Sequence, residues 1–316
     1  MSPMRVLVCG TNYGRIYLEA IRLGGASYCL AGILARGSAR SQQMAREYGV
    51  PLYRCVDDLP PSIDLACAAM GASGSDVVLD LLARGIHVLC EHPQKPRHLR
   101  SALDVAASSG LCFHINGHFA ELEAAAAFIN HCRGESRTGL PSFFHVTAND
   151  RSLYAALDIL RRVLVSFAPF QFHVTSRLPP FTIVQGVLRG VPATFHIQRS
   201  DDGRPFPDAS PSYLVDHRIA AGFPSGVLTM LSMNGPVVWN TNLNCAAGPT
   251  QPLFTVAHED RALSTELLYQ QRIAANLGAI TAVAKNICER LEPLEQTPDY
   301  LLEVSRTWET LGGLLL

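Results

Sequence analysis

The first 120 residues alternate short apolar runs with longer amphipathic stretches. The apolar runs predict strands that are buried on both faces, and the amphipathic stretches predict helices between them. The predicted strands are Val6–Cys9, Tyr28–Ala35, Asp64–Ala69, Ile86–Cys90 and Leu111–Ile115, and the predicted helices are Asn12–Leu23, Ser38–Tyr48, Ser75–Ala83 and Pro96–Ser109. This alternation predicts an α/β fold, in which residues 1–120 form an N-terminal Rossmann domain with a doubly wound parallel sheet.

After Glu121 the pattern changes from strand–helix alternation to a series of extended segments flanked by helices. Predicted strands lie at Pro141–Ala148, Phe172–Thr175, Thr182–Leu188, Ala193–Gln198, Gly226–Met233 and Val237–Leu243, and predicted helices at Glu121–His131, Ser152–Val165, Leu263–Leu291 and Tyr300–Leu314. The polar stretch Ser200–Ser212 contains three prolines and predicts a loop. We expect residues 121–316 to form an α+β domain with a largely antiparallel, open sheet.

Composition narrows the classes of protein. A length of 316 residues suits two domains, and a net charge of -1 gives no electrostatic reason to expect nucleic acid or an anionic membrane as partner. The longest apolar runs are strand-sized, and the first one ends at Gly10, so neither a membrane span nor a signal peptide is expected. The nine cysteines include no C-x-x-C pair, which predicts reduced thiols in a cytoplasmic protein without a metal site.

A glycine turn joins the first predicted strand to the first helix. It consists of Gly10, Thr11, Asn12, Tyr13 and Gly14, and it lacks the middle glycine of the common G-x-G-x-x-G pattern. Glycines at such a turn let the backbone approach a pyrophosphate, which the helix N-terminus then holds. The turn therefore predicts a dinucleotide site, although a tight turn without a ligand has the same pattern.

The end of the second strand indicates which dinucleotide would bind. NAD enzymes usually carry a carboxylate there for the ribose 2′-hydroxyl, and residues 34–41 contain none. Instead, Arg36 and Arg40 can bind a 2′-phosphate, while Ser38 caps the next helix. These residues favour NADPH as the cofactor. A solvated helix start is the alternative explanation.

Two histidines follow adjacent parallel strands, at the edge of the sheet where such folds bind ligands. His92 lies between Glu91 and Pro93, and a cis peptide before the proline would aim the imidazole. His118 follows the next strand. Because the reference pKa of histidine lies near neutrality, His92 and His118 are predicted as catalytic proton donors. Each is also compatible with a structural role.

Four further side chains are candidates for substrate contact. Asn116 ends the strand before His118. Tyr154 and Asp158 are four residues apart and share one face of a predicted helix, which is either a pocket wall or a solvated surface. Trp239 can line an aromatic substrate or pack in the core.

The sequence also resembles a known family. Glu91-His92-Pro93 is similar to the Glu-Lys-Pro motif of the glucose-fructose oxidoreductase-like family, with histidine in place of lysine. That histidine resembles the thiazolinyl imine reductases of yersiniabactin and pyochelin siderophore biosynthesis. Four further stretches are similar to that group: residues 37–41, 49–53 and 84–88, and residues 217–239 ending in Gly-Pro-Val-Val-Trp. The resemblance covers most of residues 5–245.

The resemblance implies an NADPH-dependent reductase that converts a thiazoline ring to a thiazolidine. The implied substrate is tethered as a thioester to a carrier domain of a nonribosomal peptide synthetase, and His92 would be the general acid. Glu91 and Pro93 would lie beside the cofactor. A tyrosine of the family falls at Phe119, so that His118 or a water would replace it. The open sheet of relatives often forms a homodimer.

Three alternatives remain open. A sugar or cyclitol dehydrogenase of the same superfamily would oxidise a polyol with NADP, although the missing lysine at position 92 argues against it. A non-catalytic regulator would bind NADPH without consuming it. A structural protein that retains the fold would bind no dinucleotide.

Overall fold

The computed structural model describes residues 2–137, 139–199, 215–245, 252–258 and 264–315. The chain forms two compact units. The first combines Met1–His118 with Tyr269–Ser305, and the second combines Phe119–Leu268 with Arg306–Leu316. The predicted boundary at residue 120 lies close to the observed one. The prediction of a continuous second domain is wrong, because a segment near the C-terminus returns to the first unit.

The first unit contains a six-stranded sheet with the strand order β3-β2-β1-β4-β5-β6, in which every neighbouring pair is parallel. Its strands are β1 (Met4–Cys9), β2 (Tyr28–Leu34), β3 (Leu52–Tyr53), β4 (Leu65–Ala68), β5 (His87–Glu91) and β6 (Phe113–Asn116). The helices between them are α1 (Arg15–Leu23), α2 (Ala39–Glu47), α3 (Ser75–Ala83) and α4 (Pro96–Ser109). This confirms the predicted doubly wound sheet. The short strand β3 was not predicted.

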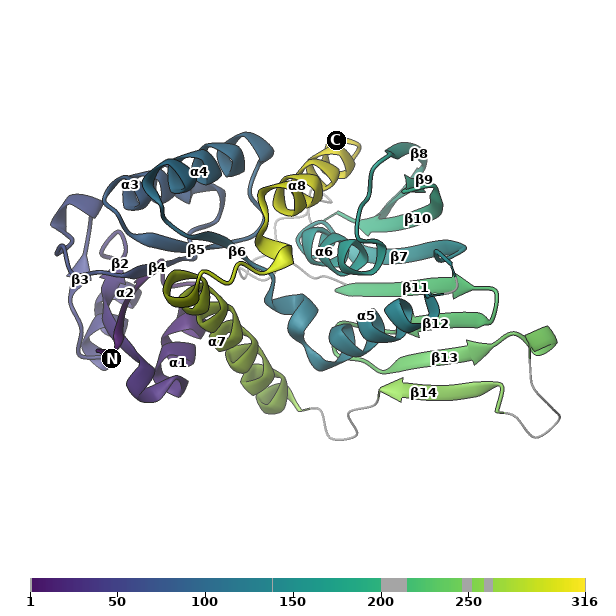
Figure 1. Cartoon of the computed structure of the whole chain (residues 1–316), viewed down its shortest axis with the longest axis horizontal. Helices are drawn as coiled ribbons and strands as arrows, with labels where there is room; N and C mark the ends of the chain where they lie inside the picture. The colour runs from purple at the N-terminus through teal and green to yellow at the C-terminus, as the bar shows by residue number, and fades with distance from the viewer. Residues whose placement is uncertain (1, 138, 200–214, 246–251, 259–263, 316) are drawn as a thin grey trace. The chain divides into compact units, whose positions relative to one another are not determined.

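Helices cover both faces of this sheet (Figure 1). α3 and α4 pack against each other on one face, while α1, α2 and the long α7 (Thr265–Glu289) lie on the other. On the second face, Ile280 and Val283 of α7 join a buried cluster with Val8 of β1 and Tyr17 of α1. This apolar contact explains why α7 belongs to the first unit.

The second unit contains an eight-stranded sheet with the order β14-β13-β12-β11-β7-β10-β9-β8. Its elements are β7 (Phe143–Asn149), β8 (Phe170–Leu178), β9 (Phe181–Leu188), β10 (Val191–Gln198), β11 (His217–Phe223), β12 (Gly226–Met230), β13 (Val237–Thr241) and β14 (Phe254–His258), with α5 (Glu123–Glu135) and α6 (Leu153–Leu164). Among the described strands of this second sheet, only β7 and β10 are parallel neighbours, which confirms the largely antiparallel sheet.

Two strands of the second unit, β11 and β14, were missed by the sequence analysis. The last helix, α8, spans Pro298–Gly313. The loop predicted at Ser200–Ser212 lies outside the described residues. No helix in the described parts of the chain is both long and apolar enough to cross a bilayer.

Candidate active site

The glycine turn has the geometry that a pyrophosphate needs. Gly10 has a φ of +89°, and a Cβ at Gly14 would lie 2.1 Å from the carbonyl oxygen of Gly10. α1 starts directly after the turn, with no side-chain cap and no acidic residue in its first turn. Its N-terminal amides are therefore accessible to an anion, as a dinucleotide site requires. The residues present fit a dinucleotide cofactor.

The start of α2 lies beside this turn. Ser38 caps α2 by accepting a hydrogen bond from the backbone nitrogen of Ser41 at 3.3 Å, as predicted. The exposed Arg40 donates from Nη1 to Oδ1 of Asn12 at 3.2 Å, so it joins the helix to the glycine turn. Arg36 is also exposed. The first turn of α2 contains no acidic residue, so nothing there repels a phosphate.

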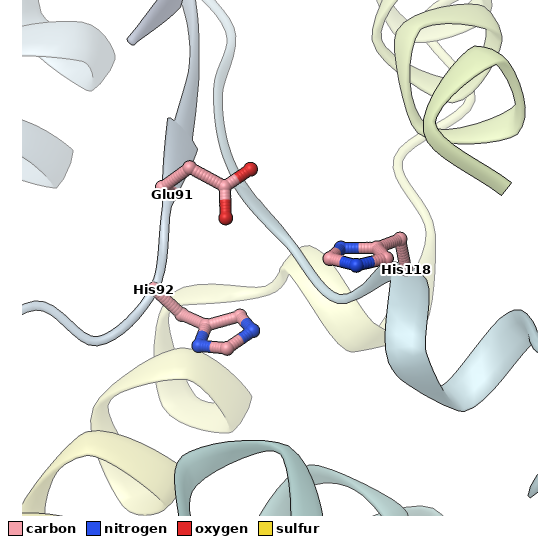
Figure 2. A group of neighbouring side chains, drawn as sticks. All are labelled: Glu91, His92 and His118. Carbon is pink, nitrogen blue, oxygen red and sulfur yellow. The ribbon is translucent and has the colours of Figure 1, made fainter. Parts of the chain in front are cut away.

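Glu91, His92 and His118 converge at the carboxyl ends of β5 and β6 (Figure 2). Glu91 is the last residue of β5 and pairs in register with Asn116 of β6. The rings of His92 and His118 stack with centroids 6.3 Å apart, and the peptide between His92 and Pro93 is cis. The structure therefore brings together the two histidines that the sequence placed at adjacent strand ends.

A buried hydrogen-bond network holds the carboxyl group of Glu91. The hydroxyl of Tyr17 and Nδ2 of Asn116 both donate to Oε1 of Glu91, the latter at 2.7 Å. Nδ2 of Asn116 also lies 2.8 Å from Oδ1 of Asn276, which belongs to α7. The side chain of Asn116 is 0% exposed. It therefore positions the carboxyl group of Glu91, and its predicted contact with substrate stays a prediction.

Tyr13 orients His118. The phenol hydroxyl of Tyr13 lies 2.8 Å from Nε2 of His118, and the two rings are 5.8 Å apart. A phenol that donates to Nε2 selects the tautomer in which Nδ1 carries the proton. Tyr13, predicted as a cofactor contact, thus also fixes the second histidine of the cluster.

Two family comparisons match separate parts of the chain. Residues 4–117 match the oxidoreductase family with an NAD-binding Rossmann fold. Residues 140–240 match the C-terminal domain described as thiazolinyl imine reductase Irp3-like. Residues 4–117 are thus a Rossmann domain of this oxidoreductase family, and residues 140–240 are an Irp3-like C-terminal domain.

Several solved structures of dehydrogenases and a ketoreductase share the fold over nearly the whole chain. Levoglucosan dehydrogenase in complex with NADH and levoglucosan superposes with a TM-score of 0.74 at 12% identity, covering 99% of this chain and 97% of that one. KijD10, a 3-ketoreductase from Actinomadura kijaniata in complex with NADP, has a TM-score of 0.70 at 16% identity, with coverages of 96% and 95%. UDP-N-acetylglucosamine 3-dehydrogenase from Acidithiobacillus ferrooxidans has a TM-score of 0.72 at 14% identity, with coverages of 99% and 98%. No curated protein matches the chain in sequence.

The pKa values of the two histidines differ from the value near neutrality on which the sequence-based prediction rests. Burial lowers the pKa of His92 to about 4, and both of its ring nitrogens are shielded from solvent. Burial, with repulsion from His92 and Arg272, holds the pKa of His118 well below its usual range. The prediction that these imidazoles are readily protonated at neutral pH is therefore wrong.

Glu91 is the group of the cluster that titrates near neutral pH. Burial raises the pKa of its carboxyl to about 7, although the hydrogen bonds from Tyr17 and Asn116 oppose the rise. The carboxyl of Glu91 therefore holds its proton to a higher pH than an exposed glutamate does. A carboxylic acid beside two neutral imidazoles is a source of one exchangeable proton.

The same cluster has the composition of a cation site. One potential ligand atom from each of Glu91, His92 and His118 lies within 4.8 Å of the others. In a tetrahedral zinc site the ligand atoms are about 3.4 Å apart, a spacing that lies inside this limit. Tyr17 and Asn116 donate hydrogen bonds to Glu91, and Tyr13 is hydrogen-bonded to His118.

The remaining candidates for substrate contact lie in the second unit, and their contact with a substrate stays a prediction. Tyr154 and Asp158 of α6 are 3% and 6% exposed, so their shared face is not a solvated surface. Asp158 pairs with Arg162 at 3.4 Å, and the ring of Tyr154 meets Trp308 edge-on. Trp239 of β13 is partly buried against the rings of His131 and Phe223.

Phe119 packs edge-on against the ring of His217, with centroids 6.3 Å apart. It therefore contributes packing at the position where the resemblance predicts a tyrosine.

The glycine turn gives a first prediction. Replacing Gly14 by alanine should lower the free energy of unfolding by about 1–3 kcal/mol and weaken NADPH binding, because the new Cβ would overlap the carbonyl of Gly10. Gly278→Ala in α7 is the control: no atom lies within 4 Å of its Cβ position, and alanine there should stabilise the helix by up to about 1 kcal/mol. Urea denaturation and fluorescence titration with NADPH measure both effects. Equal behaviour of the two variants would contradict this account of the turn.

The raised pKa of Glu91 gives a second prediction. A buried carboxyl whose pKa is raised from 4.5 to about 7 contributes stability below pH 4.5 that is lost as the pH rises through 7. Glu91→Gln keeps the acceptor for Tyr17 and cannot ionise. Its free energy of unfolding, relative to wild type, should therefore increase between pH 5 and pH 8 by as much as about 3 kcal/mol.

His92 changes stability with pH in the opposite direction, since its pKa is lowered, and it is present in both proteins, so the difference between them isolates Glu91. Glu47→Gln, on an exposed side chain of α2, controls for the substitution itself. Denaturant titrations at both pH values measure the difference. A difference between Glu91→Gln and wild type that is the same at pH 5 and pH 8 would show that the carboxyl is not held neutral.

Proposed function

We propose that this oxidoreductase uses NADPH to reduce the C=N bond of a thiazoline ring to a thiazolidine, on an intermediate bound to a carrier domain of a nonribosomal peptide synthetase. The match of residues 140–240 to the Irp3-like thiazolinyl imine reductase domain carries the proposal. The histidine that replaces lysine after Glu91 supports it independently, because it lies in the other unit of the chain.

The residues that would hold the cofactor surround the carboxyl ends of β1, β2 and β5. The glycine turn and the N-terminus of α1 would bind the pyrophosphate, and Arg36, Ser38 and Arg40 would bind the ribose 2′-phosphate. Glu91 and Pro93 would lie beside the nicotinamide. When bound, NADPH supplies a hydride. It is the protein that must supply the accompanying proton.

Reduction of C=N adds hydrogen to both atoms of the bond. As carbon receives hydride, the ring nitrogen gains electron density and needs a proton. In the proposed site, the neutral imidazole of His92 donates an N–H hydrogen bond that orients this nitrogen. Glu91 is the cluster member with a proton to give at neutral pH, since its pKa is about 7 and that of His92 is about 4. In the proposed site the hydroxyl of Tyr13 donates to Nε2 of His118, which would leave the proton on Nδ1 as a second donor.

Fold similarity favours one second candidate, a sugar or cyclitol dehydrogenase. Levoglucosan dehydrogenase and UDP-N-acetylglucosamine 3-dehydrogenase share the whole fold, at 12% and 14% identity. Such an enzyme would oxidise a polyol with NADP and would need a base to take the hydroxyl proton. Position 92 offers a buried histidine with a lowered pKa, which is a weak base.

Cofactor consumption with alternative substrates tests the proposal. We expect the protein to consume NADPH, followed at 340 nm, when given a hydroxyphenyl-thiazoline thioester on a carrier domain or as a small-molecule analogue, and to consume NADH more slowly. Mass spectrometry should show a product heavier by two hydrogens. Reduction of NADP⁺ with polyols and no turnover of thiazolines would favour the dehydrogenase. Binding of NADPH with no consumption in either assay would indicate a regulator.

The role of His92 is tested separately. His92→Ala should lower kcat for the thiazoline by about 10²- to 10³-fold, since it loses an oriented donor, while the Kd for NADPH changes by less than about twofold. His98→Ala, which removes an imidazole from α4 of the same unit, is the matched control and should retain wild-type turnover. Wild-type kcat in His92→Ala would remove this residue from the reaction.

A further inference from the structure

A third arginine lies at the start of α2, where the proposed function places the 2′-phosphate of NADPH. Arg54 follows β3, which pairs with β2 through Ile33–Leu52 and Leu34–Tyr53. The backbone nitrogen of Ala35 donates to the carbonyl of Tyr53 at 3.0 Å, which fixes the end of β3 beside the end of β2. Arg54 and Arg36 therefore leave neighbouring strands at the same edge of the sheet.

The side chain of Arg54 lies over Gly37. A Cβ at Gly37 would be 3.1 Å from Nε and 3.3 Å from Cζ of Arg54, so a side chain at position 37 would crowd the guanidinium. Gly37 has a φ of +84°, and its carbonyl accepts a hydrogen bond from the side chain of Gln42 at 2.8 Å. The loop thus leaves space for Arg54 between Arg36 and the Ser38 cap of α2.

The three arginines carry uncompensated positive charge. Within the described ranges of the chain, none of Arg36, Arg40 and Arg54 forms an ion pair. Of the two carboxylates that follow Arg54, that of Asp57 pairs with Arg84, and that of Asp58 accepts hydrogen bonds from the backbone. Three exposed guanidinium groups that follow β2, follow β3 and lie in the first turn of α2 favour an anion at this edge of the sheet.

We propose that Arg54 binds the 2′-phosphate of NADPH together with Arg36 and Arg40, and that it is a specificity-determining residue for NADPH over NADH. This inference rests on the cofactor of the proposed function, but not on the thiazoline substrate. A guanidinium presents donors in a fixed fork that fits a phosphate monoester. Gly37 is then required because it leaves room for that fork.

Isothermal titration calorimetry without any thiazoline tests the role of Arg54. The ligands are NADPH, NADH and adenosine 2′,5′-bisphosphate, which carries the 2′-phosphate without the nicotinamide. Arg54→Ala should weaken NADPH and adenosine 2′,5′-bisphosphate by about 5- to 20-fold and leave NADH within about twofold. Arg54→Lys, which keeps the charge without the fork, should fall between the wild type and Arg54→Ala.

Arg46→Ala is the matched control, because it removes an exposed arginine from the last turn of the same helix α2. It should bind all three ligands as the wild type does. Unchanged NADPH binding in Arg54→Ala, or an equal loss of NADPH and NADH, would overturn the proposal. Since these measurements need no substrate, a chain that discriminates through Arg54 but reduces no thiazoline would refute the proposed reaction and leave this inference standing.

Discussion

The buried carboxyl group of Glu91 is the constraint on which the active-site arrangement depends. An ionised carboxylate in a protein interior costs several kcal/mol unless it is neutralised or hydrogen-bonded. Glu91 is 8% exposed and meets this requirement with donors from two other elements, Tyr17 of α1 and Asn116 of β6. Asn276 of α7 supports Asn116 in turn. One side chain at the end of β5 thereby fixes the positions of a neighbouring strand and two helices.

The same burial decides how protons are distributed in the cluster. Burial in surroundings of low polarity raises the pKa of Glu91 and lowers the pKa values of His92 and His118. At neutral pH a proton in the cluster is therefore held by the carboxyl group and by neither imidazole as a charge. Both imidazoles are then neutral hydrogen-bond donors and acceptors at pH 7. Under the proposed function the histidines would orient the substrate and Glu91 would supply the proton, and the three side chains converge at one place (Figure 2).

Much of the first unit follows from sequence patterns. The apolar runs locate five of its strands, and the parallel sheet then brings residues after β5 and β6 to the same edge, which is why His92 and His118 were predicted together. The return of α7 was not predicted, because a helical pattern does not reveal which core it joins. Asn276 was missed for that reason. Arg54 was missed because β3 has two residues and no periodicity. For α7, the only signal in the sequence was an apolar pattern longer than the second domain requires.

In the second unit, the spacing of residues predicted which side chains share a helix face, but the sequence did not predict whether that face is buried. Tyr154 and Asp158 do share a face of α6, but nearly all of that helix is buried, so a four-residue spacing could not distinguish a pocket from a packed face. The pKa values were inaccessible to sequence analysis for a related reason. A shift depends on the solvent excluded by residues far apart in the chain, and Glu91, Asn116 and Asn276 come together only in the folded state.

The protonation state of the cluster also bears on the direction of the reaction. Oxidising a polyol requires a group that removes a hydroxyl proton, and an imidazole whose pKa is about 4 is a poor base for that step at neutral pH. Reducing an imine requires the opposite, a site that holds a proton until hydride has made the nitrogen basic. Glu91, with a pKa of about 7, retains such a proton in a substantial fraction of molecules. The fold shared with sugar dehydrogenases therefore leaves the reaction to the residues of the site, and under the proposed function the buried Glu91 would supply the proton that the reduced nitrogen needs.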